Sequence, residues 1–434
     1  MNWLPPFDPC ITEEDITLGY MSIKSDEEVL TKNISNITNT SRDDIKVSSY
    51  PLAIWICAYW WRLIYEPIPS DENIQKTYSW ENAHNLISAD SGYIWPSIKF
   101  IPDGQTITIS SQQQIYNRKY PLFYKGLKDP ISINTEVFTS SMKNFISNTI
   151  QRLDEHKKNN TDLHIIFDQL QTELNDEDFT LYRKMEAILG YDPDEAPENV
   201  IKKIESALKI FNEKSLIEIA SACSVNETHT QYADIESAIS MARNGIKGKW
   251  SSPISEKINI DASMPPWEAG RLLAKEVRKC IGNIDNKIET KTLCDFLGVT
   301  TKSINNKEPL HDRFNISYFK SDNLYINLKK ENTFYYSIGR RFQLARLIGA
   351  IISSISDKIF ISSDCKTYNQ KLQRAFAAEF LAPINEVKFF IEKELSTKSI
   401  RKAAKHFDVS PQTIAHSLVN NGVISKQKLD DFEL

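Results

Sequence analysis

The spacing of hydrophobic residues in the first part of the chain indicates a mixture of helix and strand. An apolar, aromatic run begins at Pro51 and ends at Glu66, and a proline suits the first turn of a helix. Further along, apolar and polar residues alternate on both sides of Asp103-Gly104, a dipeptide that favours a hairpin turn. We therefore expect a small α+β module over residues 1–128.

In residues 129–248, apolar side chains recur mainly three and four positions apart, which is the spacing of amphipathic helices. Gly190 and the prolines that follow it separate two of these helices, because glycine ends helices and proline does not continue them. Near the end of the region, Gly245 and Gly248 precede serines and Pro253. This composition is typical of a linker, so we predict a helical region that ends in one.

Residues 262–434 combine helical spacing with one strand-like stretch. The whole chain is therefore predicted to be predominantly helical, of the α+β class. In this third part we expect helices over 265–282, 289–299, 340–352 and 370–383, strands within 314–329 with a turn at Ser321-Asp322-Asn323, and a helical pair over 398–424.

The composition favours a protein of several globular domains in a reducing compartment. A chain of 434 residues with 41% hydrophobic positions is too long for one ordinary core. Its net charge of −5 gives no indication of bulk binding to nucleic acid or membranes. Six cysteines lack C-x-x-C spacing, and we find neither a secretory signal nor a membrane-spanning stretch. We expect a cytoplasmic protein with free, buried thiols.

Five strings within residues 262–434 occur in an order that resembles the ImmA/IrrE family of zinc metallopeptidases. They are "AGRLLAKEVRKCIG", "LCDFLGV", "RRFQLARLIGAII", "RAFAAEFLAP" and "FDVSPQTIAHSLVNNGVI". The third and fourth are the more specific, because two uncommon strings recur in the right order about thirty residues apart. The resemblance implies a zincin-like domain at the C-terminal end, and the first 250 residues lie outside it.

The resemblance also implies three zinc ligands and a catalytic glutamate, and this chain has none of them. In H-E-x-x-H, two histidines one helical turn apart bind zinc and the glutamate polarises the metal-bound water. The matching positions here are Arg346, Leu347 and Ala350. The third ligand, a carboxylate, falls within residues 370–373, Gln-Lys-Leu-Gln, where we take Leu372 as the vestigial position. Because arginine, leucine and alanine cannot ligate zinc, we expect a pseudo-peptidase with no catalytic residue, metal or cofactor.

Two residues around this degenerate motif also have a purely structural interpretation. The segment could be an ordinary amphipathic core helix, in which Gly349 permits close packing of another helix despite its cost of about 1 kcal/mol relative to alanine. Arg346 would then extend to the surface or pair with an acid such as Glu379.

The first functional hypothesis is a non-catalytic regulator or sensor. Members of the family often lie on mobile elements and in phage-related circuits, where they act on repressors or control toxins. The resemblance therefore implies a protein or ligand partner, such as an operon-encoded effector or repressor, in antiviral defence or a stress response. We expect a groove between the former zinc helix and the strand at Asn323–Leu328, with contacts from Asn323, Tyr325, Asn327 and Arg346.

The second hypothesis is a DNA-binding transcriptional regulator that uses residues 398–424. Their pattern resembles a helix-turn-helix, with a turn at Asp408-Val409 and a second helix introduced by Ser410-Pro411. The same helical pair packs the peptidase domain in the family, so a structural role is the alternative. The predicted phosphate contacts are Lys398, Arg401, Lys402 and Lys405, and the predicted recognition face is Gln412, Thr413, His416 and Ser417.

The third hypothesis is an enzyme whose site lies in residues 1–250. The one candidate pocket combines Trp60, Trp61 and Arg62 with Glu66 and His84. Aromatic residues at helical spacing more often belong to a core, so we rank this hypothesis below the other two.

Overall fold

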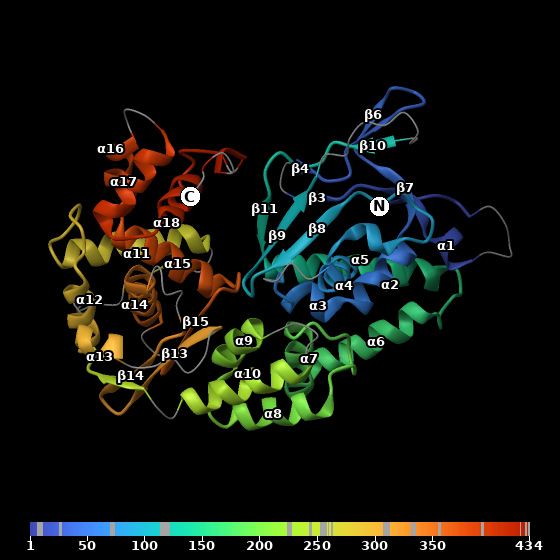
Figure 1. The fold of residues 1–434 in the computed structure, drawn as a ribbon. Helices are drawn as coiled ribbons and strands as arrows, with labels where there is room; N and C mark the ends of the chain where they lie inside the picture. The colour runs from blue at the N-terminus through green and yellow to red at the C-terminus, as the bar shows by residue number, and fades with distance from the viewer. Residues whose placement is uncertain are drawn as a thin grey trace. The chain divides into compact units, whose positions relative to one another are not determined.

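The computed structural model of the chain forms two compact units, residues 1–196 and 197–434, which are described here one at a time (Figure 1). The predominantly helical α+β class predicted from the sequence is confirmed. The structure describes residues 1–6, 12–25, 28–69, 74–112, 122–223, 228–242, 245–251, 258, 260–261, 264–306, 313–330, 336–354, 357–391, 395–425, 427–429 and 432.

The first unit contains small antiparallel sheets and seven α-helices in its described part. The sheets have the strand orders β1-β2-β7, β10-β5-β6, β11-β9-β8 and β3-β4. The strands are β1 (Asn2–Trp3), β2 (Leu18–Met21), β3 (Lys24–Ser25), β4 (Glu28–Val29), β5 (Asn33–Ser35), β6 (Ser41–Arg42), β7 (Ile45–Ser48), β8 (Ile98–Pro102), β9 (Thr106–Ser111), β10 (Leu122–Tyr124) and β11 (Ile131–Asn134). The helices are α1 (Glu13–Ile16), α2 (Ser49–Ala58), α3 (Trp60–Tyr65), α4 (Ile74–His84), the 3-10 helix η1 (Leu86–Ala89), α5 (Thr135–Glu155), α6 (Asp162–Asn175) and α7 (Glu177–Ile188).

The aromatic segment predicted as one helix forms two, α2 and α3, which meet at Tyr59. The side chain of Ser48 accepts a hydrogen bond from the Tyr50 N–H and so caps α2, as serine commonly does at this position. Trp55, Trp60 and Trp61 are buried. Because α2 packs on α5 and α6 while α3 packs on α7, the aromatic side chains form the centre of this unit's core.

The predicted hairpin at Asp103-Gly104 is confirmed, with β8 and β9 as its strands. The carboxylate Oδ1 of Asp103 accepts hydrogen bonds from the N–H groups of Gln105 and Thr106, at 3.1 and 2.8 Å. Gly104 has a φ of 94°, a conformation that glycine adopts without steric cost. The turn is therefore stabilised by residues within the turn itself.

The second unit is built around one four-stranded antiparallel sheet with the order β12-β14-β13-β15. Helix α14 packs on α15, and α15 packs on α11. Its elements are α8 (Glu198–Leu208), α9 (Glu213–Ala222), α10 (Thr228–Met241), β12 (Ile246–Gly248), α11 (Pro266–Cys280), α12 (Thr290–Leu297), α13 (Thr301–Asn306), β13 (Phe314–Lys320), β14 (Asn323–Asn327), α14 (Tyr336–Ser353), β15 (Ile359–Ser363), α15 (Tyr368–Leu381), α16 (Ile384–Ile391), α17 (Thr397–Phe407), α18 (Pro411–Asn420) and the 3-10 helix η3 (Gln427–Leu429).

The glycine-rich stretch predicted as a linker is part of this sheet, and that prediction is wrong. Residues Ile246–Gly248 form strand β12, which pairs antiparallel with β14. A Cβ atom at Gly248 would lie 2.2 Å from the carbonyl oxygen of Leu297. Glycine is needed here because two backbone segments approach closely, and not because the chain must be flexible.

The structure divides the chain at residues 196 and 197, and not at 128 and 248 as the sequence suggested. Helices α5, α6 and α7 of the expected middle region pack within the first unit. Helices α8, α9 and α10 belong to the second unit, where α9 packs on β15. The helical spacing showed correctly that each helix has an apolar face, but it carries no information about which core receives that face.

Close helix packing in the second unit depends on two glycines. A Cβ at Gly270 of α11 would lie 2.5 Å from the carbonyl oxygen of Leu372 in α15. A Cβ at Gly349 of α14 would lie 2.6 Å from the ring of Phe376, which is fully buried. The sequence-based expectation that Gly349 permits close packing is confirmed, and α14 and α15 are held side by side.

The expectation of buried thiols is confirmed for four of the five described cysteines and is wrong for Cys280. Of the five described cysteines, Cys57, Cys223, Cys294 and Cys365 are buried thiols and Cys280 is exposed; Cys10 lies outside the described residues. Within the described residues, no helix combines the length and the apolar character needed to cross a membrane.

Candidate functional site

The degenerate motif lies on α14, and its three side chains face the interior. Arg346 is 3% exposed, Leu347 is 4% exposed and Ala350 is 4% exposed. Leu347 and Ala350 belong to the hydrophobic core of the second unit. A buried arginine among apolar neighbours needs polar partners, because an uncompensated charge in such surroundings is strongly unfavourable.

Arg346 finds these partners on β15 and α15. Its Nη2 donates to the carbonyl oxygen of Ser363, at 2.6 Å, and to the Oε1 of Gln370. The Asp364 carboxylate lies 4.0 Å from Nη1. Burial, with the nearby cation of Arg374, lowers the pKa of Arg346 to about 9, so the guanidinium stays charged at neutral pH.

Arg346 does not pair with Glu379, the acid proposed from the sequence. The carboxylate of Glu379 instead accepts a hydrogen bond from the N–H of Ile384, at 3.2 Å. Burial raises the pKa of Glu379. Glu379 therefore stabilises the start of α16, whereas Arg346 is held by the backbone of β15 and by Gln370.

Of the candidate third-ligand positions 370–373, Gln370 is the one whose side chain hydrogen-bonds to Arg346. Leu372, chosen from the sequence as the vestigial position, is a buried member of the hydrophobic core. Leu372 points away from Arg346 because it lies two positions after Gln370, which rotates the side-chain direction by roughly 200° around the axis of α15. At this point between α14 and α15, Arg346 therefore faces the uncharged amide of Gln370.

The amide of Gln370 connects Arg346 to a buried glutamate that sequence reasoning missed. Its Nε2 donates to the carboxylate of Glu218 at 2.8 Å and to the carbonyl oxygen of Ile361 at 3.0 Å. Glu218 lies on α9 and is 6% exposed. It also accepts hydrogen bonds from Thr367, at 3.0 and 2.9 Å, and from Asn369, at 2.9 Å.

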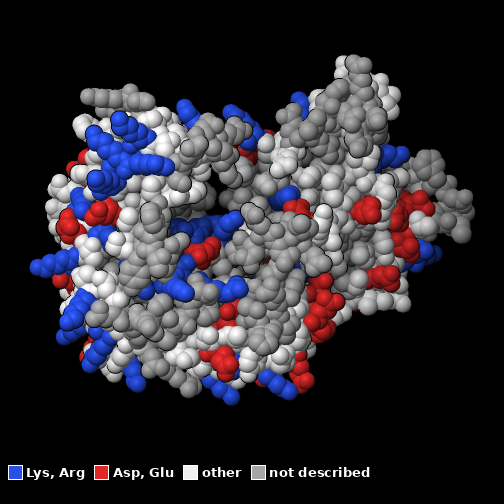
Figure 2. Space-filling view, in the orientation of Figure 1, with Lys and Arg blue, Asp and Glu red and all other residues white. Residues whose placement is uncertain are grey.

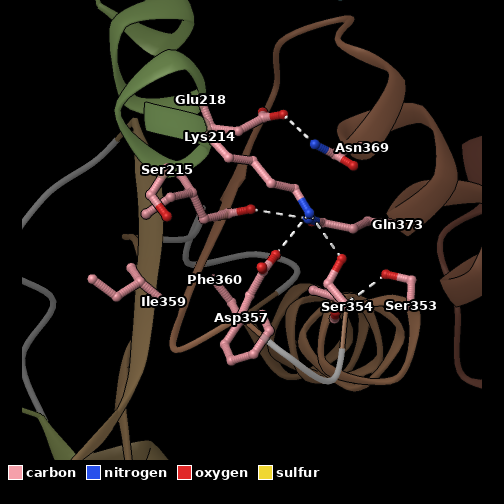
Figure 3. A pocket seen from close by; sticks show the side chains of 12 residues that line it. Lys214, Ser215, Glu218, Ser353, Ser354, Asp357, Ile359, Phe360, Asn369 and Gln373 are labelled. Carbon is pink, nitrogen blue, oxygen red and sulfur yellow. Dashed lines mark hydrogen bonds and ion pairs between the residues drawn. The ribbon is translucent and has the colours of Figure 1, made fainter. Parts of the chain in front are cut away.

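The space beside Ala350 is a cavity of only about 30 Å³, close to the volume of one water molecule. Figure 3 shows Lys214 reaching across it toward Asp357 and Ser354. The Lys214 ammonium lies 2.7 Å from the Asp357 carboxylate and 3.0 Å from the Ser354 hydroxyl. Helix α9 supplies Lys214 and Glu218 to this cavity, which has no room for a peptide substrate.

Strand β14, expected to line a partner groove with α14, has neighbours on both sides. It pairs with β12 along one edge and with β13 along the other. Asn327 is buried and donates to the carbonyl oxygen of Met241 at 2.8 Å, and Tyr325 stacks on Tyr318. Asn323 and Tyr325 are partly exposed, whereas Asn327 and Arg346 are not. Because both edges are paired, an extended peptide cannot add to β14.

The helical pair at the C-terminal end forms where the sequence predicted it. Asp408 ends α17 in the left-handed conformation, with a φ of 50°, and the Ser410 side chain accepts from the Thr413 N–H to cap α18. The predicted phosphate-binding residues Lys398, Arg401, Lys402 and Lys405 are exposed on α17.

The predicted recognition face of α18 lines a groove and is only partly exposed to solvent. Gln412 and His416 are exposed and Thr413 is partly exposed, while Ser417 is buried. All four border a groove whose other walls come from α11, α14 and α15. A helix that recognises DNA bases must enter a major groove about 12 Å wide. The residues of α11, α14 and α15 that line the groove beside α18 hinder such an approach.

In the first unit, the candidate pocket around Arg62 is a closed polar cluster. Trp61 is 3% exposed, Arg62 is 3% exposed and His84 is fully buried. Arg62 forms an ion pair with Glu66 at 2.7 Å, and the two nitrogens of the His84 ring face the carbonyl oxygens of Trp80 and Arg62, both at 2.9 Å. The structure brings these predicted residues together, but as a buried network with its own partners.

Comparisons with protein families, with curated proteins and with solved structures find no match to this chain. Among the described residues, no group of three or more histidine, cysteine, aspartate or glutamate side chains could hold a metal ion.

Proposed function

We propose that this protein is a non-catalytic, protease-like regulator or sensor that binds a protein or ligand partner. The observation that supports this most directly is the buried contact between Arg346 and Gln370. These two positions match the first zinc ligand and the carboxylate ligand of the peptidases that the chain resembles. An arginine offers no lone pair to a metal, and its charge repels a dication.

The surroundings of Arg346 support the same proposal. Leu347, at the position of the catalytic glutamate, cannot act as a base, and it belongs to the hydrophobic core. Lys214 and Glu218 of α9 border the small cavity beside Ala350. By the same resemblance, the partner is an operon-encoded effector or repressor in a mobile-element, phage-defence or stress-response circuit.

The test is native mass spectrometry of the full-length protein purified without chelators, together with a cleavage assay on casein. We expect a mass without zinc, and casein that stays intact with or without 1,10-phenanthroline. A second species in the same spectrum would identify the partner. One zinc per chain and cleavage that the chelator abolishes would overturn the proposal.

A second candidate function, DNA binding through α17 and α18, is favoured by one observation. Lys398, Arg401, Lys402 and Lys405 recur at helical spacing and are exposed, and Figure 2 shows basic side chains gathered over the surface where α17 lies. Clustered cations of this kind bind phosphates by releasing counterions. The groove in front of α18 counts against sequence-specific reading, so we rank this function second.

The double substitution K402E/K405E tests DNA binding. If α17 contacts DNA, removing two cations and adding two anions should weaken binding to a mixed-sequence duplex by at least a hundredfold at low salt, and should flatten its salt dependence. The matched control is K24E/K46E, because Lys24 and Lys46 are exposed on strands of the first unit. Equal binding by the two variants in a fluorescence-anisotropy titration, or no binding by the wild type, would exclude this function.

A further inference from the structure

A large groove in the second unit is lined by residues of α11, α14, α15 and α18, four helices that are labelled in Figure 1. Its volume of about 690 Å³ is within the range of roughly 300–1,000 Å³ that is usual for small-molecule sites. Among the described residues that line it there is no aspartate or glutamate. The lining includes Trp267, Phe342, Lys371, Arg374, Thr413 and His416.

Two cationic side chains, Lys371 and Arg374, line the groove. Arg374 donates to the carbonyl oxygens of Ser363 and Cys365, at 3.3 and 2.7 Å, and among the described residues it forms no ion pair with a carboxylate. Burial lowers the pKa of Arg374, and its charge in turn lowers that of Arg346 behind it. The carboxylates of Asp364 and Glu218 favour the charged form of both arginines, and an anion in the groove would favour it further.

The N-terminus of α18 adds to this positive character. The helix begins at Pro411 and runs for ten residues, and Ser410, Gln412 and Thr413 of its first turn line the groove. The aligned peptide dipoles of a helix place partial positive charge at its N-terminus. Pro411 has no N–H and the Thr413 N–H is bonded to Ser410, so α18 contributes this dipole and not a set of free donors. Lys371 and Arg374 of α15 line the same groove, so two independent sources of positive charge meet in it.

The groove also offers flat apolar surfaces. Trp267 of α11 and Phe342 of α14 both line it and are each only partly buried. Partly exposed aromatic rings are suited to stacking on another planar ring, which stabilises nucleobases without reading their identity. Gln412, Thr413 and Asn420 supply side chains that can form hydrogen bonds with the edge of such a ring.

From this combination we infer that the groove binds a nucleotide, a small ligand that joins a planar aromatic base to a phosphate. The phosphate lies toward Lys371, Arg374 and the start of α18, and the base stacks on Trp267 or Phe342. This inference rests on the proposed function, because it names the ligand that such a sensor detects. It also explains why the exposed side of α18 faces a groove: Thr413 and His416 contact a small ligand there, not a DNA duplex.

The test is isothermal titration calorimetry of the full-length protein with ATP, GTP, adenosine, inorganic phosphate and a twelve-residue single-stranded oligonucleotide. We expect at least one nucleotide to bind with a micromolar dissociation constant, and adenosine and phosphate to bind at least tenfold more weakly. Lys371→Glu should weaken nucleotide binding by at least tenfold because it places an anion beside the phosphate. Trp267→Ala should weaken it about tenfold by removing a stacking surface.

Lys302→Glu is the matched control, because it makes the same change of charge at an exposed lysine of α13 that does not line the groove. It should leave nucleotide binding within twofold of the wild type. No nucleotide binding by the wild type, equal losses in Lys371→Glu and Lys302→Glu, or binding of the oligonucleotide alone would each overturn the inference. A protein that binds no nucleotide but remains free of zinc and proteolytically inactive would refute this site and leave the proposed function standing.

Discussion

Replacing Arg62 with methionine is expected to lower the free energy of unfolding of the first unit by roughly 3–5 kcal/mol, the usual loss when one partner of a buried ion pair is removed. Arg62 is 3% exposed and donates to Glu66, which is 1% exposed, at 2.7 Å from Nε and 3.2 Å from Nη2. Methionine keeps much of the volume but leaves the carboxylate buried without its cation. The pair with Asp192 adds little, because that side chain is 40% exposed.

This loss should depend on pH. Burial raises the pKa of Glu66 to about 7 even with Arg62 beside it, and removing the cation raises it further. A carboxyl group whose pKa is higher in the folded state contributes stability at low pH, and that contribution is lost as the pH rises through the folded-state value. The difference between R62M and the wild type should therefore be smaller at pH 5 than at pH 8.

Urea unfolding followed by tryptophan fluorescence measures this effect, because six of the eight tryptophans precede residue 197. The matched control is R42M, since Arg42 is exposed on β6, and it should change stability by less than about 0.5 kcal/mol. The double variant R62M/E66M should recover most of the loss, because neither charge is then left unpaired. A loss below about 1 kcal/mol in R62M, which is the typical effect of an ordinary substitution, would contradict the structural role given to this pair.

Structural features that depend only on residues a few positions apart in the chain could be predicted from the sequence. The hairpin at Asp103 forms because its side chain bonds to N–H groups two and three residues later. The turn between α17 and α18 likewise depends on Ser410 and its bond to Thr413. The strand at Ile246–Gly248 could not be found in this way, because a glycine required by the backbone of Leu297 looks the same in a sequence as a glycine in a linker.

The same distinction applies to the candidate site: some of its features follow from the residue types, and others depend on contacts between residues far apart in the chain. The absence of zinc ligands at positions 346 and 350 follows directly from the residue types. The partners of Arg346 do not, because Gln370 is 24 residues away in the chain and Glu218 lies 152 residues before Gln370. Glu218 sits in a helix outside the family resemblance, where nothing in its local pattern distinguishes it from a solvent-exposed acid. Its role depends on the packing of α9 against β15.

Introducing ligands at positions 346, 350 and 370 is expected to convert this region into a zinc site. In the triple variant R346H/A350H/Q370E, two histidines one turn apart on α14 would face a carboxylate on α15, which is the ligand set of a three-ligand zinc site. The present contact between the side chains at 346 and 370 shows that these two positions face one another across α14 and α15. Structural zinc sites in zinc-finger peptides, which have four ligands, bind with roughly 10 kcal/mol or more, or a dissociation constant of about 50 nM or lower. The three-ligand site designed here is expected to bind more weakly than that.

Leu347 is left unchanged in this variant, because a glutamate at that buried position would add an unpaired charge to the core. The zinc content after gel filtration, measured by native mass spectrometry, is expected to be one per chain for the triple variant and zero for the wild type. The matched control R346H/A350H retains Gln370 and should bind zinc more weakly, because an amide is a poorer ligand than a carboxylate. Circular dichroism and thermal melting establish that each variant is folded. A folded triple variant that binds no zinc would mean that α14 and α15 are not arranged as in a zinc peptidase, and the resemblance on which the regulator proposal rests would lose its structural support.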